Sequence, residues 1–144
     1  MIETARAYDL AAITALLRDV QLPSSDLDEA KLTHFLVLRD VDSSLVRGAV
    51  GFEPHGAVAL LRSLVVASAQ RGGGQGAALV NAIEARARKS GIGELYLLTT
   101  TADAFFARLG YVRTARESTP AALQATTEFA ALCPTSAVCM HKTL

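Results

Sequence analysis

A run of small residues at positions 71–76, Arg-Gly-Gly-Gly-Gln-Gly, has the clearest chemical meaning in the chain. Its four glycines lack Cβ atoms, so the backbone amides can turn inward and approach a bound oxygen closely. The run joins an apolar strand pattern to a helix pattern, and a helix N-terminus carries a partial positive charge of about half a unit. Arg71 adds a charge-assisted donor. The loop therefore predicts a phosphate or pyrophosphate site; the alternative is a flexible connecting turn.

Two common nucleotide-binding loops do not fit this run. A P-loop needs Lys and then Ser or Thr after its last glycine, whereas Gly76 is followed by Ala77 and Ala78. A Rossmann loop has the spacing G-x-G-x-x-G near the start of its unit, with an acidic residue about twenty positions later. The glycines of 72–76 lack that spacing, and a Rossmann unit leaves the preceding half of the chain unexplained.

The surrounding elements follow from apolar spacing and turn residues. The predicted strands cover 2–6, 35–39, 45–52, 58–66, 95–99, 111–115 and 137–142. The predicted helices cover 10–20 behind an Asp9 N-cap, part of 26–33, the segment from the loop to Lys89, a short helix capped by Thr101, and 120–132, where Leu123, Phe129 and Leu132 share an apolar side. Residues 53–56 are predicted to close a hairpin before a central strand at 58–66 that is buried on both faces.

Two motifs in these elements resemble one enzyme superfamily. Leu64–Val65–Val66, followed after four residues by the 71–76 run, resembles the acetyl-CoA signature R-x-x-G-x-G of GNAT acetyltransferases. Residues 102–111, ADAFFARLGY, resemble the superfamily's A-x-x-F-Y-x-x-x-G-F block. The resemblance covers essentially the whole of 1–144 as one domain. It implies an α+β fold: a mixed, mostly antiparallel sheet of six to seven strands, with a splayed parallel pair and helices on both faces in three layers.

The resemblance also implies the chemistry, which is acetyl transfer from acetyl-CoA, as co-substrate and without a metal, to the primary amine of a small molecule. The pantetheine arm is expected between strands 58–66 and 95–99, and the pyrophosphate at the glycine loop. The implied cofactor contacts are Leu64, Val65, Val66, Arg71, Gly72, Gly73, Gly74, Gln75, Gly76, Thr99, Thr100, Phe105, Phe106 and Arg108.

The catalytic groups of the superfamily cannot simply be transferred. Family members often use a Glu on the central strand as base and the Tyr of the F-Y block as acid, but 58–66 contains no acid and Phe106 replaces the tyrosine. Glu53 and His55 are candidate bases for the amine, directly or through water; the alternative is a solvated turn. A dedicated acid is dispensable, since a thiol has an ordinary pKa near 8.5.

Three further candidates keep two interpretations each. Arg62 is the one charge in an apolar strand, so it either binds an acidic group of the acceptor or pairs with a neighbouring carboxylate. Tyr111 is either an acid for the leaving thiolate or a core residue. Thr99, which stands where the family often has Asn, either bonds the cofactor with its threonine neighbours or belongs to a helix cap.

Composition limits the partners. The 14 basic residues balance the 14 acidic residues, which gives no electrostatic reason to expect nucleic acid or an anionic membrane. Cys133 and Cys139 are too few for a disulfide framework and are expected as free thiols. With no signal stretch and no apolar run long enough to span a membrane, we expect a cytoplasmic protein, and by analogy with the superfamily a homodimer.

Three segments, 59–64, 97–101 and 129–140, resemble one GNAT branch more closely, the small acetyltransferases associated with bacterial arsenic-resistance operons. This resemblance implies a detoxification setting, in which Arg62 would meet a carboxylate or arsinate of the acceptor. The alternatives are that Cys133 and Cys139 bind trivalent arsenic or are simply packed thiols. A rival function is a non-catalytic sensor that binds acetyl-CoA or a metalloid, because the strand acid and the tyrosine are both missing.

Overall fold

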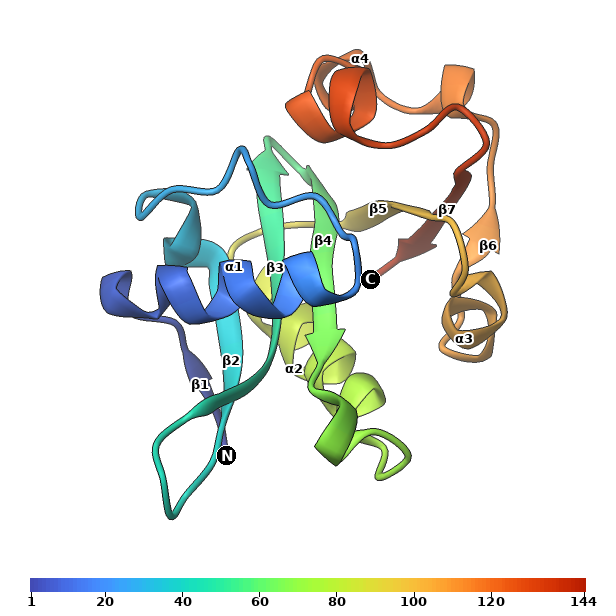
Figure 1. Ribbon diagram of the computed structural model, residues 1–144. Helices are drawn as coiled ribbons and strands as arrows, with labels where there is room; N and C mark the ends of the chain where they lie inside the picture. The colour runs from blue at the N-terminus through green and yellow to red at the C-terminus, as the bar shows by residue number, and fades with distance from the viewer.

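Seven strands form one sheet in the computed structural model, which describes residues 1–144 apart from the side chain of Leu132 (Figure 1). The strands are β1 (Ile2–Thr4), β2 (Phe35–Arg39), β3 (Val46–His55), β4 (Val58–Val66), β5 (Glu94–Thr99), β6 (Val112–Arg113) and β7 (Val138–Thr143). The α-helices are α1 (Leu10–Asp19), α2 (Gln75–Lys89), α3 (Asp103–Arg108) and α4 (Ala121–Gln124). Short 3-10 helices cover Ala7–Asp9, Lys31–His34, Ser68–Gln70 and Arg116–Ser118, and a π-helix covers Glu128–Leu132.

The strand order across the sheet is β1-β2-β3-β4-β5-β7-β6. Every neighbouring pair is antiparallel except β4 and β5, which run parallel. A parallel pair needs a crossover connection, and the glycine loop with α2 supplies it. The topology confirms the predicted mixed, mostly antiparallel sheet.

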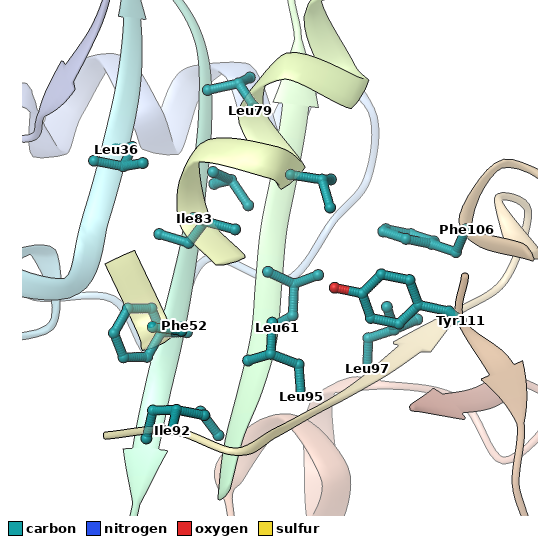
Figure 2. Packing of buried hydrophobic residues seen from close by; sticks show 14 of the residues in the cluster. Leu36, Phe52, Leu61, Leu79, Ile83, Ile92, Leu95, Leu97, Phe106 and Tyr111 are labelled. Carbon is teal, nitrogen blue, oxygen red and sulfur yellow. The ribbon is translucent and has the colours of Figure 1, made fainter. Parts of the chain in front are cut away.

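Helices cover both faces of the sheet, as predicted. On one face, Ile13 and Leu17 of α1 are fully buried against Phe35 and Val37 of β2. On the other face lies α2, whose apolar side of Leu79, Val80, Ile83 and Ala87 packs on the sheet (Figures 1 and 2). These four residues are the predicted apolar face of the helix.

The parallel strands β4 and β5 separate soon after they begin. They pair only from Val58 to Leu60, opposite Glu94 to Tyr96, although β4 continues to Val66 and β5 to Thr99. Beyond this point β5 turns away from β4 and stays paired with β7, and the divergence is visible in Figure 1. The predicted splayed pair is therefore present, with the edge of β4 facing β5 left unpaired beyond Leu60.

A β-bulge re-aims the second half of β4. Gly51 pairs with Arg62 and Ala49 pairs with Val65, so β4 has one residue more than β3 in this interval. Ser63 takes up the extra residue with φ of 61°, a left-handed conformation that a serine rarely adopts. Conformations of this kind cluster at functional sites, and this one lies where the two strands separate.

Local predictions fail where tertiary contacts decide. Asp9 precedes α1 but does not cap it, because its carboxylate accepts hydrogen bonds from the Arg6 amide (2.9 Å) and from Arg39 (2.7 Å). The predicted helix 120–132 is interrupted: α4 ends at Gln124, and Glu128–Leu132 is a π-helix. The predicted apolar contribution of Leu132 lies outside the described side chains.

Candidate functional site

A cavity of about 510 Å³ opens between the separating strands β4 and β5. One wall consists of β4 residues 61–64, and the opposite wall of residues 97–102 with Phe106 of α3. The segment 20–23 with Arg18 of α1 borders it, and so do Glu128, Cys133, Pro134 and Ala137. The volume falls in the usual range for small-molecule sites, roughly 300–1,000 Å³.

A buried ion-pair cluster stands at the β4 wall. The side chain of Arg62 is fully buried, and its guanidinium donates to Asp26 Oδ1 (2.8 Å), Glu53 Oε1 (2.8 Å) and Ser63 Oγ (3.0 Å). Lys31 binds the same two carboxylates, at 2.8 Å from Asp26 and 3.3 Å from Glu53. Of the two interpretations of Arg62, the structure therefore supports pairing with neighbouring carboxylates, because these contacts occupy the donors that an acceptor's acidic group would need.

The pKa values of the cluster follow from these bonds. Burial alone would raise the pKa of Asp26, but hydrogen bonds from Arg62 and Lys31 hold it well below its ordinary value. Burial alone would lower the pKa of Arg62, but its bond with Asp26 and the charge of Glu128 raise it. Both groups are therefore charged at neutral pH.

Glu128 is the exception among these carboxylates. It comes from the π-helix, its side chain is 8% exposed, and Oε2 lies 3.4 Å from Arg62 Nε. That contact lacks hydrogen-bond geometry, and Oε2 has no hydrogen-bond partner among the described residues. Burial raises the pKa of Glu128 to about 7, although the Arg62 charge opposes the shift. Glu128 can therefore exchange a proton near neutral pH.

Cys133 lies beside Glu128 on the cavity wall, with Sγ 3.8 Å from Glu128 Oε1. Burial and the neighbouring carboxylate raise the pKa of this thiol to about 12. Cys139 is buried in β7, and burial raises its pKa to about 11. Both cysteines are free, as predicted, and both are protonated thiols at neutral pH.

The glycine loop presents unused backbone donors at the start of α2. Gly72 (φ 87°) and Gly74 (φ 77°) are left-handed, and a Cβ at either position would meet no atom within 4 Å. Among the described residues, the amides of 72–77 have no hydrogen-bond acceptor. Arg71 folds back so that Nε donates to the Val66 carbonyl (3.0 Å), while its exposed guanidinium remains beside the loop. These features fit the predicted pyrophosphate group of a coenzyme.

A short aromatic contact joins the loop to the cavity. A Cβ on Gly76 would lie 3.3 Å from the ring of Phe105, so a larger residue would require that ring to shift slightly. Phe105 stacks edge-on against Phe106 with ring centroids 5.1 Å apart, and Phe106 lines the cavity. Phe105 and Phe106 thus lie between the start of α2 and the cavity wall. Arg108 lies on the exposed part of α3.

The threonines after β5 are placed partly as expected. Thr99, Thr100 and Thr101 all line the cavity. Thr101 is the predicted cap of α3, but no side chain caps this helix, and Thr99 Oγ1 accepts the amide of the preceding Ala102 (2.9 Å). Leu64 lines the cavity, whereas the side chain of Val65 is buried on the α1 face, which leaves only its backbone for a cofactor.

Tyr111 does not reach the cavity. Its side chain is 2% exposed, and its hydroxyl donates to Glu84 Oε2 of α2 (2.9 Å), a carboxylate that also pairs with Lys142 (3.0 Å). Figure 2 shows Tyr111 inside the core beside Phe106 and Leu97. Burial and the Glu84 charge raise the pKa of this hydroxyl far above its ordinary value. The structure therefore supports the core role and argues against the proposed acid.

The hairpin candidates also change position. Strand β3 extends to His55, so Glu53 is a strand residue opposite Leu60, and the turn lies at Gly56. Glu53 is bound by Arg62 and Lys31, and neither Glu53 nor His55 belongs to the cavity lining. The solvated-turn alternative is wrong for Glu53, and its ion pairs argue against its role as an open base.

Sequence reasoning missed Glu128, Asp26 and Arg18. Glu128 precedes Phe129 in a segment that reads as an ordinary amphipathic helix, where a glutamate is normally solvated. Asp26 lies in a polar loop 36 residues from its partner Arg62. The isolated charge of Arg62 was the available signal, since a buried guanidinium requires carboxylate partners.

The described residues offer neither a metal-binding cluster nor a helix that could cross a membrane. They contain no group of three or more His, Cys, Asp or Glu side chains arranged to hold a metal ion. None of their helices combines the length and the apolar character that crossing a membrane requires.

Known structures share this fold. Rv2747 from Mycobacterium tuberculosis, solved with CoA and NLQ, matches with a TM-score of 0.83 and 20% identity over 100% of this chain and 99% of that chain. N-acetylglutamate synthase from Neisseria gonorrhoeae, complexed with coenzyme A and N-acetyl-glutamate, matches with a TM-score of 0.85 and 20% identity. This match covers 100% of this chain and 35% of the synthase chain. The PaiA N-acetyltransferase from Thermoplasma acidophilum, in complex with coenzyme A, matches with a TM-score of 0.71 and 14% identity over 100% of this chain and 98% of that chain.

Sequence comparison identifies the family. No curated protein matches the chain. A family profile described as "Acetyltransferase (GNAT) domain" matches residues 31–113, which is more than half of the chain. The chain therefore belongs to the acetyltransferase (GNAT) domain family, which confirms the predicted class of acetyl-CoA-dependent N-acetyltransferases.

Proposed function

We propose that this protein acetylates the primary amine of a small, amino-acid-like molecule with acetyl-CoA. The observation that carries the proposal is the cavity of about 510 Å³ between β4 and β5, joined through Phe105 and Phe106 to the glycine loop. A loop of hydrogen-bond donors at one end and a cavity of this size at the other suit a long coenzyme whose reactive group lies far from its phosphates.

The loop residues are proposed to hold the coenzyme by its pyrophosphate. Amides of 72–76 supply donors at the N-terminus of α2, and Arg71 supplies the positive charge. The unpaired edge of β4 at Leu64 and Val66 supplies backbone groups for the pantetheine arm, with Thr99 and Thr100 opposite. Acetyl-CoA, when bound, supplies an acetyl group activated as a thioester.

The acceptor is proposed to occupy the part of the cavity bordered by the 20–23 segment. Arg18 is exposed there, and its side chain takes part in no hydrogen bond or ion pair among the described residues. It can bind a carboxylate of the acceptor, which is the role first considered for Arg62. The gonococcal synthase, complexed with N-acetyl-glutamate, provides a parallel for an amino-acid acceptor on this fold.

The biological setting that we propose is detoxification in arsenic resistance, in the cytoplasm, by a one-domain enzyme that forms a homodimer. Its support is the resemblance of residues 59–64, 97–101 and 129–140 to the acetyltransferases of arsenic-resistance operons. An arsinate, like a carboxylate, shares one negative charge between two oxygens and is a suitable ligand for Arg18. The balanced net charge gives no support for a nucleic-acid or membrane partner.

Measuring the release of coenzyme A, the free thiol product, tests this function. The protein is mixed with acetyl-CoA and individual amines, including L-glutamate, L-methionine and ethanolamine, and free coenzyme A is measured over time. Saturable, amine-dependent release with formation of the N-acetyl product supports the enzyme. Tight acetyl-CoA binding without release supports the sensor, which the absence of an acid on β4 and the presence of Phe106 favour.

A further inference from the structure

Glu128 is the one cavity-lining carboxylate, and its surroundings differ from those of the two acids nearby. Asp26 and Glu53 each accept hydrogen bonds from Arg62 and face Lys31 as well. Glu128 Oε2 lies 3.4 Å from Arg62 Nε and accepts no hydrogen bond from the described residues. Three carboxylates therefore face two cations, and Glu128 is the carboxylate left without full compensation.

An uncompensated buried carboxylate usually costs stability, so its retention needs an explanation. The backbone around Glu128 is also unusual, because it begins a five-residue π-helix. Insertions of this kind are rare and occur frequently at functional sites. Glu128 lines the space where β4 and β5 separate, and Ser63 of the β-bulge lines the same space.

We propose that Glu128 accepts the proton of the acceptor's ammonium group and so generates the neutral amine that is acetylated. The inference rests on the proposed function and adds the base that the family motifs do not supply here. The chain carries no acid on β4. Of the two candidate bases, Glu53 is bound by Arg62 and Lys31, and neither Glu53 nor His55 lines the cavity. Glu128 is thereby assigned as a catalytic residue.

The step balances without any further reagent. Glu128 takes one proton from the ammonium group, and the amine nitrogen bonds to the acetyl carbonyl carbon as the carbon–sulfur bond breaks. The sulfur leaves with its electron pair and receives the second proton that the nitrogen loses. Glu128 then returns its proton to water. Because a thiol has an ordinary pKa near 8.5, no separate side-chain acid is needed.

The charges around Glu128 set its proton affinity. Burial raises its pKa to about 7, Arg62 on β4 opposes that shift, and Asp26 and Glu53 reinforce it. Cys133 is a neutral neighbour at neutral pH. Two further cations are Lys31, which pairs with Asp26 and Glu53, and Arg116, whose charge acts on Cys133. A base poised near the working pH is the most effective kind for proton transfer at that pH.

The test compares Glu128→Gln with Glu117→Gln, which makes the same change at an exposed site of the same C-terminal segment. Thiol release is followed from pH 6 to 9.5 with ethanolamine and with hydroxylamine, which is already neutral at pH 7. Acetyl-CoA affinity is measured by calorimetry. The Glu128 carboxyl is titrated by ¹³C NMR in the protein without coenzyme, with the Gln variant identifying its signal.

We expect Glu128→Gln to lower kcat/KM for ethanolamine at pH 7 by about 100-fold or more, with the loss shrinking toward pH 9.5. Hydroxylamine turnover and acetyl-CoA affinity should stay within a few-fold of wild type, and Glu117→Gln should match wild type throughout. A titration midpoint near 7 supports the inference. Equal losses for both amines at every pH, or ethanolamine turnover near wild type in Glu128→Gln, would overturn the base role of Glu128 and leave the proposed function intact. Acetyl-CoA binding without turnover in wild type would overturn it together with the proposed function.

Discussion

Arg62 Nε lies 3.4 Å from Glu128 Oε2, yet Arg62 directs its hydrogen bonds to Asp26, Glu53 and Ser63. The guanidinium thus stabilises two carboxylates fully and the third only by proximity. At the β4 wall of the cavity, Arg62, Asp26 and Glu53 therefore carry fixed charges, and Glu128 in the cavity lining is the group that can titrate near neutral pH. This division of charge and the open amides of the glycine loop both have measurable consequences.

Replacing Gly74 by Val should weaken acetyl-CoA binding, because its Cβ branches would fill the open space in front of the loop amides. A loss of one or two charge-assisted hydrogen bonds corresponds to an affinity decrease of about 10- to 100-fold. Calorimetric titration measures it. Gly56→Val is the matched control, since Gly56 is also left-handed (φ 70°) with nothing within 4 Å of a Cβ. Both variants should lose stability, but only Gly74→Val should lose acetyl-CoA affinity. Equal acetyl-CoA affinities of the two variants would contradict the proposal that the loop binds the pyrophosphate.

Replacing Arg62 by Ala should destabilise the fold strongly, by about 3–5 kcal/mol, because Asp26 and Glu53 lose their shared cation inside the protein. Urea unfolding at pH 7 measures the free energy. The control is Arg113→Ala, whose partner Asp103 lies in an exposed pair and whose loss should cost about 1 kcal/mol or less. Similar costs for the two variants would show that the Arg62 cluster does not hold β4 in place.

Replacing Arg18 by Ala should raise KM for acceptors that carry a carboxylate, such as L-glutamate, by about 10-fold, with little effect on kcat. The physical reason is the loss of a charge-assisted hydrogen bond at the cavity border. Ethanolamine, which has no acidic group, should react as with wild type. If KM rose equally for both acceptors, the carboxylate contact would be excluded.

Replacing Tyr111 by Phe should leave thiol release within a few-fold of wild type, because the hydroxyl faces Glu84 inside the core. The cost should appear in stability, at about 1–3 kcal/mol, since Glu84 loses a buried donor while keeping Lys142. Parallel measurements of kcat and of unfolding separate the two effects. A kcat reduced 100-fold with stability unchanged would restore the acid role.

The pH dependence of stability should carry a signature of Glu128. An ordinary Glu has a pKa of about 4.3, whereas burial raises that of folded Glu128 to about 7. Between these values the unfolded chain has released its proton and the folded chain keeps it, so stability falls as pH rises. The contribution is on the order of 3 kcal/mol and should be absent in Glu128→Gln. Unfolding free energies of both proteins at pH 5, 6, 7 and 8 measure it; parallel curves would contradict the raised pKa.

The cofactor side of the site was predictable from the sequence because it is local. Residues 71–76 connect one strand to the next helix, so glycine content and neighbouring apolar patterns suffice to predict an anion-binding turn. The same holds for α2, whose four apolar positions repeat at helical spacing and all face the sheet. Both features depend on contacts between near neighbours in the chain.

The acceptor side was not predictable because long-range contacts create it. Asp26 reaches Arg62 across 36 residues, and Glu53 reaches it because β3 extends into the predicted turn. Glu128 enters the cavity through a π-helix, whose geometry helical spacing does not reveal. The side chain of Thr101 does not cap α3 as predicted, and Thr99 Oγ1 instead accepts the amide of Ala102, the residue that precedes the helix.

The central claim is that the glycine loop and the β4–β5 cavity together bind acetyl-CoA, and a crystal structure of the complex tests it most directly. The pyrophosphate should contact the amides of 72–76, the pantetheine arm should follow β4 from Val66 toward Leu64, and the thioester should lie near Glu128. Coenzyme bound elsewhere on the protein, or a thioester remote from the wall formed by Arg62 and Glu128, would contradict the account.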